Sequence, residues 1–290
     1  MNELSPTSPP RVVTSIPEMH SAVRTLQREG KSVGLVPTMG ALHEGHLSLV
    51  REAKTKCDAV VATIFVNPTQ FSPHEDFSKY PRTLDSDLAA LEKAHCDLVF
   101  VPSREEMYPV GATTWVEPPA AAAPLEGVCR PGHFRGVTTV VLKLLNIIPA
   151  DVAYFGQKDY QQALVLRRMA ADLNVATRLV VCPTVRESDG LAMSSRNRYL
   201  STSERQQALA LYRALYEAEE LVAGGERDAE RIRVTMRQAL TSAGIQRIDY
   251  AALAHPETLD ELTTMSGPAV ALIAAFVGTT RLIDNCLLQG

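Results

Sequence analysis

Short, almost wholly apolar segments alternate with amphipathic segments through the first 180 residues of this 290-residue chain. The apolar segments are residues 32–37, 58–66, 97–101, 152–155 and 177–182. Segments with apolar residues at helical spacing are residues 17–28, 46–56, 83–95, 137–148 and 161–173. Strands that alternate with helices favour βαβ units, and all-apolar strands indicate that helices cover both faces. The sequence therefore predicts a doubly wound, parallel, Rossmann-like α/β sheet.

The pattern changes after Pro183. Two long helices are predicted at residues 201–223 and 228–243, the first with an N-cap at Ser201 or Thr202. Three short strand candidates follow, at residues 248–253, 270–276 and 280–287. We therefore expect two domains, residues 1–183 and a smaller α+β domain of residues 184–290.

Composition excludes several classes of protein. The 29 basic and 33 acidic residues give a net charge of −4, which argues against a dedicated nucleic-acid surface. No run of eighteen apolar residues predicts a membrane span, and the first ten residues lack the pattern of a signal peptide. Five scattered cysteines without CxxC spacing predict neither a disulfide framework nor a zinc site, and they favour a reducing cytoplasm.

The segment VPTMGALHEGH, residues 36–46, follows the first predicted strand and opens a helix. In such sheets ligands bind beyond the carboxyl ends of the strands, and a helix N-terminus attracts anions. His43 and His46 are three residues apart and are expected to project to one side, where two imidazoles can stabilise charge on phosphates. Metal binding or an incidental pair are the alternatives, although the spacing HExH differs from the HExxH of zinc proteases.

Two amides, Asn67 and Gln70, follow the second strand, which Pro68 ends. Amides both donate and accept hydrogen bonds, which suits a substrate with hydroxyl and carboxylate groups. The alternative is a structural turn with an asparagine cap. The polar residues 72–82, which include two prolines, form a candidate lid.

The segments FGQKDYQQ and MSSR carry the remaining chemical signals. Lys158 can contact a phosphate, and Asp159 can accept hydrogen bonds from ribose hydroxyls or cap a helix; a surface ion pair is the alternative. Ser194, Ser195 and Arg196 form a candidate phosphate clamp, because arginine binds phosphate oxygens bidentately. The alternative for these three residues is a polar linker.

These segments together resemble the motifs of the pantothenate synthetase family. LVPTMGALHEGHLSLV is similar to its opening motif, and FVNPTQF, FGQKDYQQ and LAMSSRNRYL resemble its later ones. The first also resembles the HxGH signature of the nucleotidyltransferase and class I synthetase superfamily, and the last resembles its KMSKS-like loop. The resemblance implies ATP-dependent condensation of pantoate with β-alanine through a pantoyl-adenylate. AMP and pyrophosphate would be released, in a step of vitamin B5 and coenzyme A biosynthesis.

The resemblance also implies roles for individual residues. The second histidine of the motif, His46, would assist departure of the ATP phosphates as an acid. The implied catalytic residues are His43, His46, Lys158 and Arg196. The implied ATP-binding residues are Met39, Gly40, His43, His46, Gly156, Gln157, Lys158, Asp159, Val185, Met193, Ser194, Ser195 and Arg196. The implied pantoate- and β-alanine-binding residues are Asn67, Gln70 and Gln162.

Magnesium is expected to bind mainly through the ATP phosphates, without a metal site made by the protein. The family often has two adjacent acids at the start of the third helix, whereas Ser86 separates Asp85 from Asp87 here. Whether either carboxylate ligates Mg²⁺ stays open at this point, because acids in a first helical turn are usually partners of the helix dipole.

By the same resemblance, residues 1–183 would bind nucleotide and pantoate, residues 184–290 would close over the site, and the enzyme would be a homodimer. We expect small-molecule substrates and no nucleic-acid or membrane partner. A related enzyme that releases a dinucleotide is one alternative, which the amides Asn67, Gln70 and Gln162 disfavour. A non-catalytic nucleotide-binding protein is another, and the joint presence of the four implied catalytic residues disfavours it.

Overall fold

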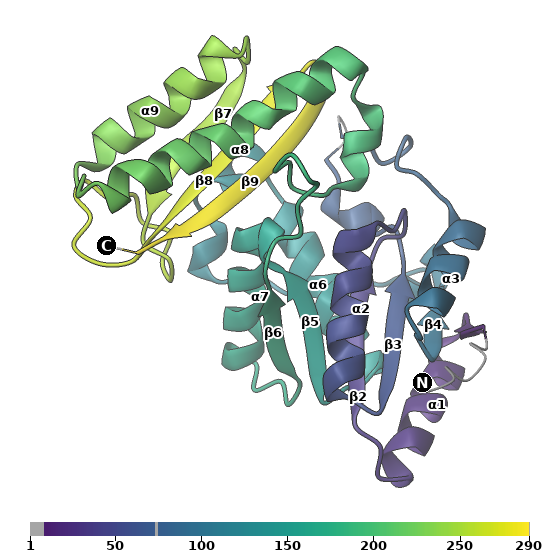
Figure 1. Ribbon diagram of the computed structural model, residues 1–290. Coiled ribbons are helices and arrows are strands. Elements are labelled where there is room, and N and C mark those ends of the chain that lie inside the picture. Colours follow the sequence, from purple (N-terminus) through teal and green to yellow (C-terminus); the bar gives the residue numbers. More distant parts are fainter. Residues whose placement is uncertain (1–8, 73–74, 290) are drawn as a thin grey trace, which may run out of the picture. The chain divides into compact units, whose positions relative to one another are not determined.

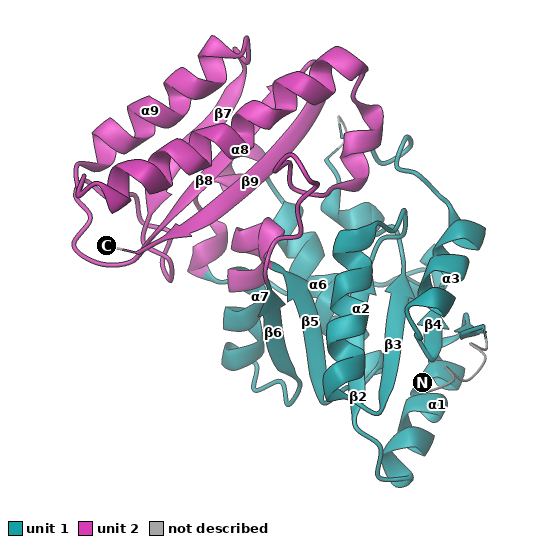
Figure 2. Cartoon of the chain, in the orientation of Figure 1, with its two compact units in different colours: residues 1–119, 130–156, 165–182 teal, residues 120–129, 157–164, 183–290 magenta. Residues whose placement is uncertain are grey.

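The computed structural model describes residues 9–72 and 75–289, and the chain divides into two compact units (Figures 1 and 2). Unit 1 comprises the described residues up to Pro119, together with Arg130–Gly156 and Val165–Cys182. Unit 2 comprises Ala120–Cys129, Gln157–Leu164 and the described residues from Pro183 onward. Two short segments that precede Pro183 in the sequence thus belong to unit 2.

A six-stranded sheet forms the centre of unit 1, counted over the described residues. Its strands, in spatial order, are β1 (Arg11–Val13), β4 (Leu98–Phe100), β3 (Ala59–Ile64), β2 (Val33–Thr38), β5 (Val152–Gly156) and β6 (Arg178–Cys182). Every pair is parallel. The strand order reverses between β2 and β5, so the carboxyl ends of these two strands flank the topological switch point where such sheets bind ligands.

Helices cover both faces of this sheet (Figure 1). They are α1 (Ile16–Arg28), α2 (Glu44–Lys56), α3 (Leu84–Lys93), α6 (His133–Ile147) and α7 (Tyr160–Asp172), with a short α4 (Arg104–Met107). Successive strand residues point to opposite faces: Leu35 joins the hydrophobic cluster under α1 and α6, and Val36 joins the cluster under α2 and α3. The predicted doubly wound α/β sheet is confirmed.

Unit 2 contains a three-stranded antiparallel sheet in the order β7-β8-β9, within the part of the chain that the structure describes. The strands are β7 (Ile248–Ala254), β8 (Ala269–Val277) and β9 (Thr280–Leu288). Two helices pack on it, α8 (Thr202–Ala223) and α9 (Ala229–Ser242), and share its hydrophobic core. Ser201 and Glu204 form a capping box at the start of α8, as the sequence indicated. The predicted smaller α+β part is also confirmed.

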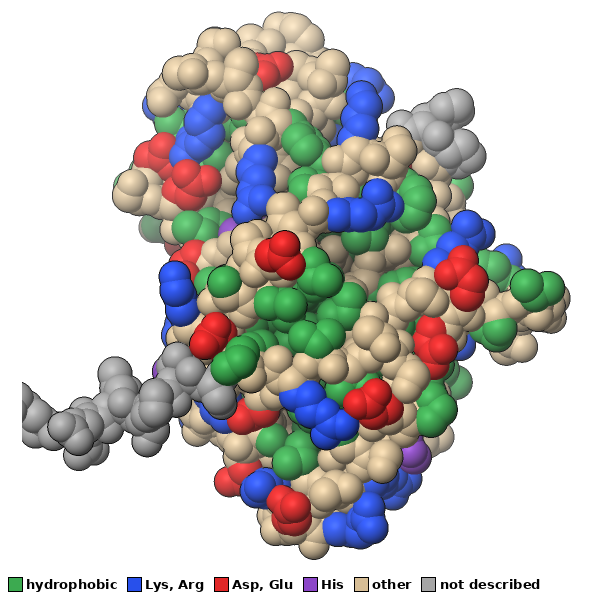
Figure 3. All heavy atoms as spheres, turned by 90° about the vertical axis from the view of Figure 1, so that its right-hand side faces the viewer, with side chains coloured by type: hydrophobic (Ala, Val, Ile, Leu, Met, Phe, Trp, Pro, Cys, Tyr) green, Lys and Arg blue, Asp and Glu red, His purple; other side chains and the backbone are tan. Residues whose placement is uncertain are grey.

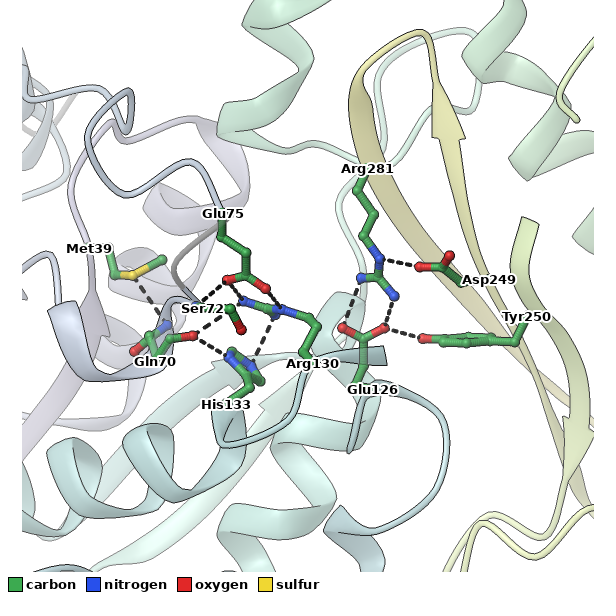
Figure 4. A network of polar contacts seen from close by, with 10 residues as sticks. All are labelled: Met39, Gln70, Ser72, Glu75, Glu126, Arg130, His133, Asp249, Tyr250 and Arg281. Atoms are coloured by element: carbon green, nitrogen blue, oxygen red, sulfur yellow. Dashed lines mark hydrogen bonds and ion pairs between the residues drawn. The ribbon is translucent and has the colours of Figure 1, made fainter. Parts of the chain in front are cut away.

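The segment Ala120–Cys129, which carries the short α5 (Glu126–Cys129), is tied to unit 2 by a buried acid. Glu126 accepts hydrogen bonds from the Arg281 guanidinium at 2.9 and 2.6 Å and from the Tyr250 hydroxyl at 2.7 Å (Figure 4). Arg281 also contacts Asp249 at 2.7 Å. Burial raises the pKa of Tyr250, and the charge of Glu126 raises it further, so the phenol remains a hydrogen-bond donor.

Two elements differ from the expectation in an instructive way. Helix α6 begins at His133, four residues before the predicted start, because Gly132 takes a left-handed φ of 83° that turns the chain into the helix. Strand β1 was not predicted, since three residues give too little pattern to identify a strand.

Within residues 9–72 and 75–289, no helix has the length and apolar character needed to cross a bilayer. The face drawn in Figure 3 carries acidic and basic side chains interspersed around apolar ones.

Candidate active site

The turn between β2 and α2 places two imidazoles side by side, with ring centroids 4.1 Å apart. Nδ1 of His43 accepts a hydrogen bond from the Gly45 N–H at 3.1 Å, and Nδ1 of His46 accepts one from the His43 N–H at 3.4 Å. A backbone N–H can only donate, so the neutral form of each ring carries its proton on Nε2. The expectation that both rings project to one side is confirmed, and each ring is a donor through Nε2.

A buried carboxylate holds this histidine turn, by which we mean residues 39–43. Gly40 and Ala41 have left-handed φ values of 81° and 51°, a conformation that costs free energy for alanine. Asp87 of α3, only 2% exposed, accepts hydrogen bonds from the N–H groups of Ala41 at 2.9 Å and Leu42 at 2.8 Å. A Cβ on Gly40 would lie 3.1 Å from the same carboxylate, which explains the glycine.

These contacts bear on magnesium. Mg²⁺ usually keeps several waters when proteins bind it, and the Asp87 carboxylate is buried against backbone N–H groups and the Thr83 hydroxyl, 3.2 Å from each oxygen. Asp85 is exposed in the first turn of α3. Among the residues described here, no group of three or more His, Cys, Asp or Glu side chains has the geometry to hold a metal ion. The Asp87 carboxylate is thus already engaged by backbone N–H groups and a hydroxyl, whereas Asp85 is exposed to solvent.

The amide of Gln70 has a fixed orientation. Oδ1 of Asn67 accepts from the Thr69 N–H at 3.4 Å, and Nδ2 of Asn67 donates to the Gly136 carbonyl at 3.2 Å. These backbone partners fix the Asn67 amide, because a carbonyl only accepts and an N–H only donates. Nδ2 of Asn67 also lies 3.1 Å from Gln70, so the atom there is Oε1. Gln70 consequently turns its N–H donors toward Met39, whose sulfur lies 3.4 Å from Nε2.

A second set of contacts fixes the backbone of Gln70 (Figure 4). The Gln70 carbonyl lies 2.9 Å from Nδ1 of His133, and Nε2 of His133 lies 3.1 Å from the Arg130 guanidinium. Since arginine only donates, Nε2 accepts from Arg130 and Nδ1 donates to the carbonyl. Arg130 also pairs with Glu75 at 2.6 and 2.9 Å. Burial raises the pKa of Glu75, but the hydrogen bond and charge of Arg130 outweigh it and lower the pKa.

Two residues near Gln70 were not identified from the sequence. The Tyr108 hydroxyl donates to Oδ1 of Asn67 at 3.0 Å. Gly136 of α6 allows close packing, because a Cβ there would lie 2.4 Å from the Thr69 carbonyl oxygen. A glycine inside a strongly apolar helix pattern is a signal of close approach, whereas nothing in the sequence marks Tyr108.

The candidate lid, residues 72–82, is described in part, since residues 73–74 lie outside the described residues. In the described part, Phe71 packs edge-on against Phe77 and Tyr80, with centroid distances of 5.4 and 6.0 Å. Tyr80 is buried. A lid function for this segment stays a prediction.

In unit 2 a second turn follows β5, the single-turn helix η3 (Gln157–Asp159), which we call the lysine turn. Nδ2 of Asn285, on β9, donates to the carbonyls of Gln157 at 3.0 Å and Lys158 at 2.9 Å. Nζ of Lys158 lies 3.7 Å from the Asp159 carboxylate. Gln162 is partly buried on the first turn of α7, one residue after the buried Gln161.

The remaining predicted ATP-binding residues are also in unit 2. The Met193 N–H donates to the Val185 carbonyl at 3.0 Å, so these two residues lie across from each other in a hairpin. Ser194 caps the short helix η4 (Ser195–Tyr199) by accepting from the Arg196 N–H at 3.2 Å. Arg186, next to Val185, pairs bidentately with Asp284 of β9 at 2.7 and 3.0 Å. The structure thus places the predicted residues in two sets, one in each unit.

A doubly wound sheet with paired imidazoles after one switch-point strand and a lysine turn after the other defines a class. It is that of α/β enzymes that bind their ligands at the carboxyl edge of the sheet. Comparison with known proteins identifies the family within this class. The sequence profile described as Pantoate-beta-alanine ligase matches residues 11–287, and the chain belongs to this family.

Relatives match over nearly the whole chain. The pantothenate synthetase of Acidobacterium capsulatum is 56% identical over 289 residues, which cover 96% of this chain and 97% of the relative. The crystal structure of pantothenate synthetase from Thermus thermophilus has a TM-score of 0.90 at 46% identity and covers 95% of this chain and 98% of its own. The pantoate-beta-alanine ligase of Francisella tularensis, solved with beta-gamma ATP and beta-alanine, has a TM-score of 0.77 at 36% identity and covers 96% and 97%.

Proposed function

We propose that the protein uses ATP to condense pantoate with β-alanine to pantothenate through a pantoyl-adenylate, as a ligase of pantothenate biosynthesis. The observation that carries this proposal is the match to pantothenate synthetases over almost the full length of the chain. A homologous ligase was solved with beta-gamma ATP and beta-alanine, which supports ATP and β-alanine as substrates.

In the first step, a pantoate carboxylate oxygen attacks the α-phosphorus of ATP. An acyl–phosphate bond forms, and the bond from the α-phosphorus to the bridging oxygen breaks, so that pyrophosphate leaves. His46 assists by donating from Nε2 to the departing phosphates, and the tautomer set by the His43 N–H supports this role. Such donors act mainly by stabilising developing charge in a fixed geometry.

We assign further ATP contacts to residues of both units. His43, Lys158 and Arg196 neutralise charge on the phosphates as catalytic residues. Contacts with ATP are also assigned to Met39, Gly40, Gly156, Gln157, Asp159, Val185, Met193, Ser194 and Ser195. Mg²⁺ enters bound mainly to the phosphates of ATP, a role that fits the engagement of the Asp87 carboxylate by the N–H groups of Ala41 and Leu42. When bound, the ion screens the phosphate charges.

Gln70 and Gln162 bind pantoate. Gln70 presents N–H groups and not its oxygen, so its partner on pantoate is a hydroxyl or carboxylate oxygen. Asn67 is 1% exposed and its amide is engaged by protein groups, so it acts on pantoate through Gln70. In the second step, the amine of β-alanine attacks the acyl carbonyl, loses a proton, and AMP leaves. Residues 184–290 close over the site and keep water from the mixed anhydride.

The first test is a His46→Ala variant, with His20→Ala on α1 as the control. Loss of a donor to the leaving phosphates is expected to slow pantoate-dependent pyrophosphate exchange about 100-fold or more, with a small effect on the affinity for ATP. An unchanged exchange rate in His46→Ala would remove the assigned role of His46.

The second test is the reaction itself, run with ATP, pantoate and β-alanine and with each omitted in turn. Sustained formation of AMP and pyrophosphate that needs both pantoate and β-alanine supports the proposal, while ATP and pantoate alone should release at most one pyrophosphate per enzyme and no AMP. A dinucleotide product would identify a nucleotidyltransferase instead. Binding of labelled ATP without turnover would identify a non-catalytic nucleotide-binding protein.

The assembly and compartment of the enzyme follow from the same proposal. We assign it to the cytoplasm, which the five unpaired thiols support, and from the resemblance to its family we expect a homodimer. Sedimentation equilibrium at micromolar concentration tests the assembly, since a monomer has a mass of 31.6 kDa.

A further inference from the structure

Strand β9 carries a buried asparagine that no sequence motif marks. Asn285 is 2% exposed, and its Nδ2 lies 3.0 Å from the Gln157 carbonyl oxygen and 2.9 Å from the Lys158 carbonyl oxygen. Both partners can only accept, so the nitrogen of the amide faces them and the orientation is unambiguous. Oδ1 of Asn285 then lies 3.4 Å from Nε2 of Gln157. One side chain thus binds two successive carbonyls and one side chain of the lysine turn.

Asn285 is itself held from two directions. Its N–H donates to Oδ1 of Asp284 at 2.8 Å, and its carbonyl accepts from the Arg186 guanidinium at 3.3 Å. Arg186 pairs with the buried Asp284 and also donates to the Gly190 carbonyl at 3.0 Å. The position of Asn285 is therefore fixed by contacts other than those with the lysine turn. A residue fixed in this way can define the position of the turn to which it donates.

The lysine turn needs an external support of this kind. Its three residues form a single turn of 3₁₀-helix at the start of α7, and the side chains of Lys158 and Asp159 are 20% and 48% exposed. Gly156, just before the turn, has no atom within 4 Å of where a Cβ would lie. The hydrogen bonds from the Asn285 side chain to the carbonyls of Gln157 and Lys158 bind this turn to strand β9.

We infer that Asn285 is a positioning residue for Lys158, a role that rests on the proposed contact of Lys158 with ATP. It does not touch the substrate. Its two hydrogen bonds hold the lysine turn so that the ammonium group is already in place when ATP binds. Preorganisation of this kind lowers the free energy needed to reach the transition state.

The test is a double-mutant cycle of Asn285→Ala and Lys158→Ala, measured as kcat/KM for ATP in pyrophosphate exchange. Asn285→Ala is expected to lower this value about 10-fold to 100-fold, the effect of two hydrogen bonds. In a Lys158→Ala background the same change is expected to have little further effect, because the group that Asn285 positions is gone. A role in stability alone would give two multiplying effects.

A matched control is Gln207→Ala. The Gln207 side-chain amide also donates to a backbone carbonyl of unit 2, that of Ala243 at 2.9 Å. The Gln207→Ala change is expected to leave kcat/KM for ATP unchanged. If Asn285→Ala does not fold, Asn285→Asp replaces it, since a carboxylate of the same shape repels the two carbonyls. Thermal unfolding of each variant shows that the assays compare folded proteins.

The outcomes separate this inference from the proposed function. If the two changes have independent, multiplying effects on kcat/KM, or if the Asn285 variant has a normal kcat/KM, the inference is overturned. The assignment of Lys158 to ATP survives in both cases, provided that Lys158→Ala still lowers the rate. An unchanged rate in Lys158→Ala overturns the assignment of Lys158 to ATP, and the positioning role falls with it. A loss in each single variant with no further loss in the double variant supports both.

Discussion

The histidine turn and the lysine turn follow the two strands beside the switch point, yet opposite backbone groups hold them. In the histidine turn a buried carboxylate, Asp87, accepts from two successive N–H groups. In the lysine turn a buried amide, that of Asn285, donates to two successive carbonyls. The first turn has its N–H groups occupied near the histidines, and the second has its carbonyls occupied near the lysine.

This difference indicates which groups each turn can offer a phosphate. In the histidine turn the N–H groups of Ala41 and Leu42 face Asp87, so in our proposal the imidazoles, and not these N–H groups, donate to the anion. In the lysine turn the bonds to Asn285 occupy acceptors, which an anion does not need. Asp87 thus takes two backbone donors away from the ligand, whereas Asn285 occupies carbonyls that would otherwise repel an anion.

The strongest way to break this comparison is Asp87→Ala. The change leaves two buried N–H groups without partners and removes support from the left-handed Ala41. We expect the free energy of unfolding to fall by about 3 kcal/mol and the adenylation rate to fall at least as much as in Asn285→Ala. Denaturant unfolding and pyrophosphate exchange measure the two effects.

A magnesium titration separates positioning from metal binding at the same residue. Asp87→Asn keeps the size of the side chain but loses one acceptor, and excess Mg²⁺ is not expected to restore its rate. Asp85→Asn, exposed on the same helix, is the matched control and should behave as the unchanged protein. Full recovery of Asp87→Asn at high Mg²⁺ would show that Asp87 ligates the ion.

The next change extends the comparison to Gln70. This residue is held in place by close packing of the backbone as well as by hydrogen bonds. In Gly136→Ala the new Cβ would lie 2.4 Å from the Thr69 carbonyl oxygen, so α6 or the Gln70 segment must shift. We expect about 2 kcal/mol of destabilisation and a tenfold higher KM for pantoate, with less change in the KM for ATP. Gly267→Ala, where a Cβ has open space, is the control. Equal rises in both KM values would point to general damage.

The sequence was sufficient for those features that repeat or form contiguous motifs. Apolar runs such as residues 58–66 predicted β3, and the spacing of His43 and His46 predicted that their rings share a side. The motif of Lys158 predicted a turn after a strand. Each of these signals lies within a few neighbouring residues, which is the range over which periodicity and turn chemistry act.

The residues that hold the motifs could not be predicted in this way. Asn285 contacts Lys158 across 127 residues of sequence, and Tyr108 contacts Asn67 across 41. The sequence marks Asp87 only as an acid in the first turn of a helix, where acids usually interact with the helix dipole. Its hydrogen bonds to Ala41 and Leu42 depend on how α3 packs. Such contacts depend on tertiary structure, which one sequence without its fold does not specify.

A smaller effect is expected where only one donor is removed. Tyr108→Phe loses the hydrogen bond to Oδ1 of Asn67, which retains the Thr69 N–H, so the orientation of the Gln70 amide is weakened and not lost. We expect a rise of about threefold to tenfold in the KM for pantoate, equivalent to one hydrogen bond, at unchanged KM for ATP. Tyr216→Phe, on an exposed residue of α8, is the comparison variant. A normal KM for pantoate in Tyr108→Phe would show that Thr69 and Gly136 suffice to orient Asn67.

The smallest effect concerns the ion pair that supports the Gln70 carbonyl through His133. The charge and hydrogen bond of Arg130 lower the pKa of Glu75 below its ordinary value of 4.5 against the opposing effect of burial. A lowered pKa in the folded state adds stability above pH 4.5, and that stability is lost as the pH falls through the folded value.

The difference in unfolding free energy between the unchanged protein and Glu75→Gln should therefore be constant near neutral pH. Below pH 4.5 it should shrink, whereas Glu18→Gln, in an exposed pair with Arg11, should give little difference throughout. A difference for Glu75→Gln that persists unchanged in acid would mean that shape, and not charge, is what Arg130 recognises.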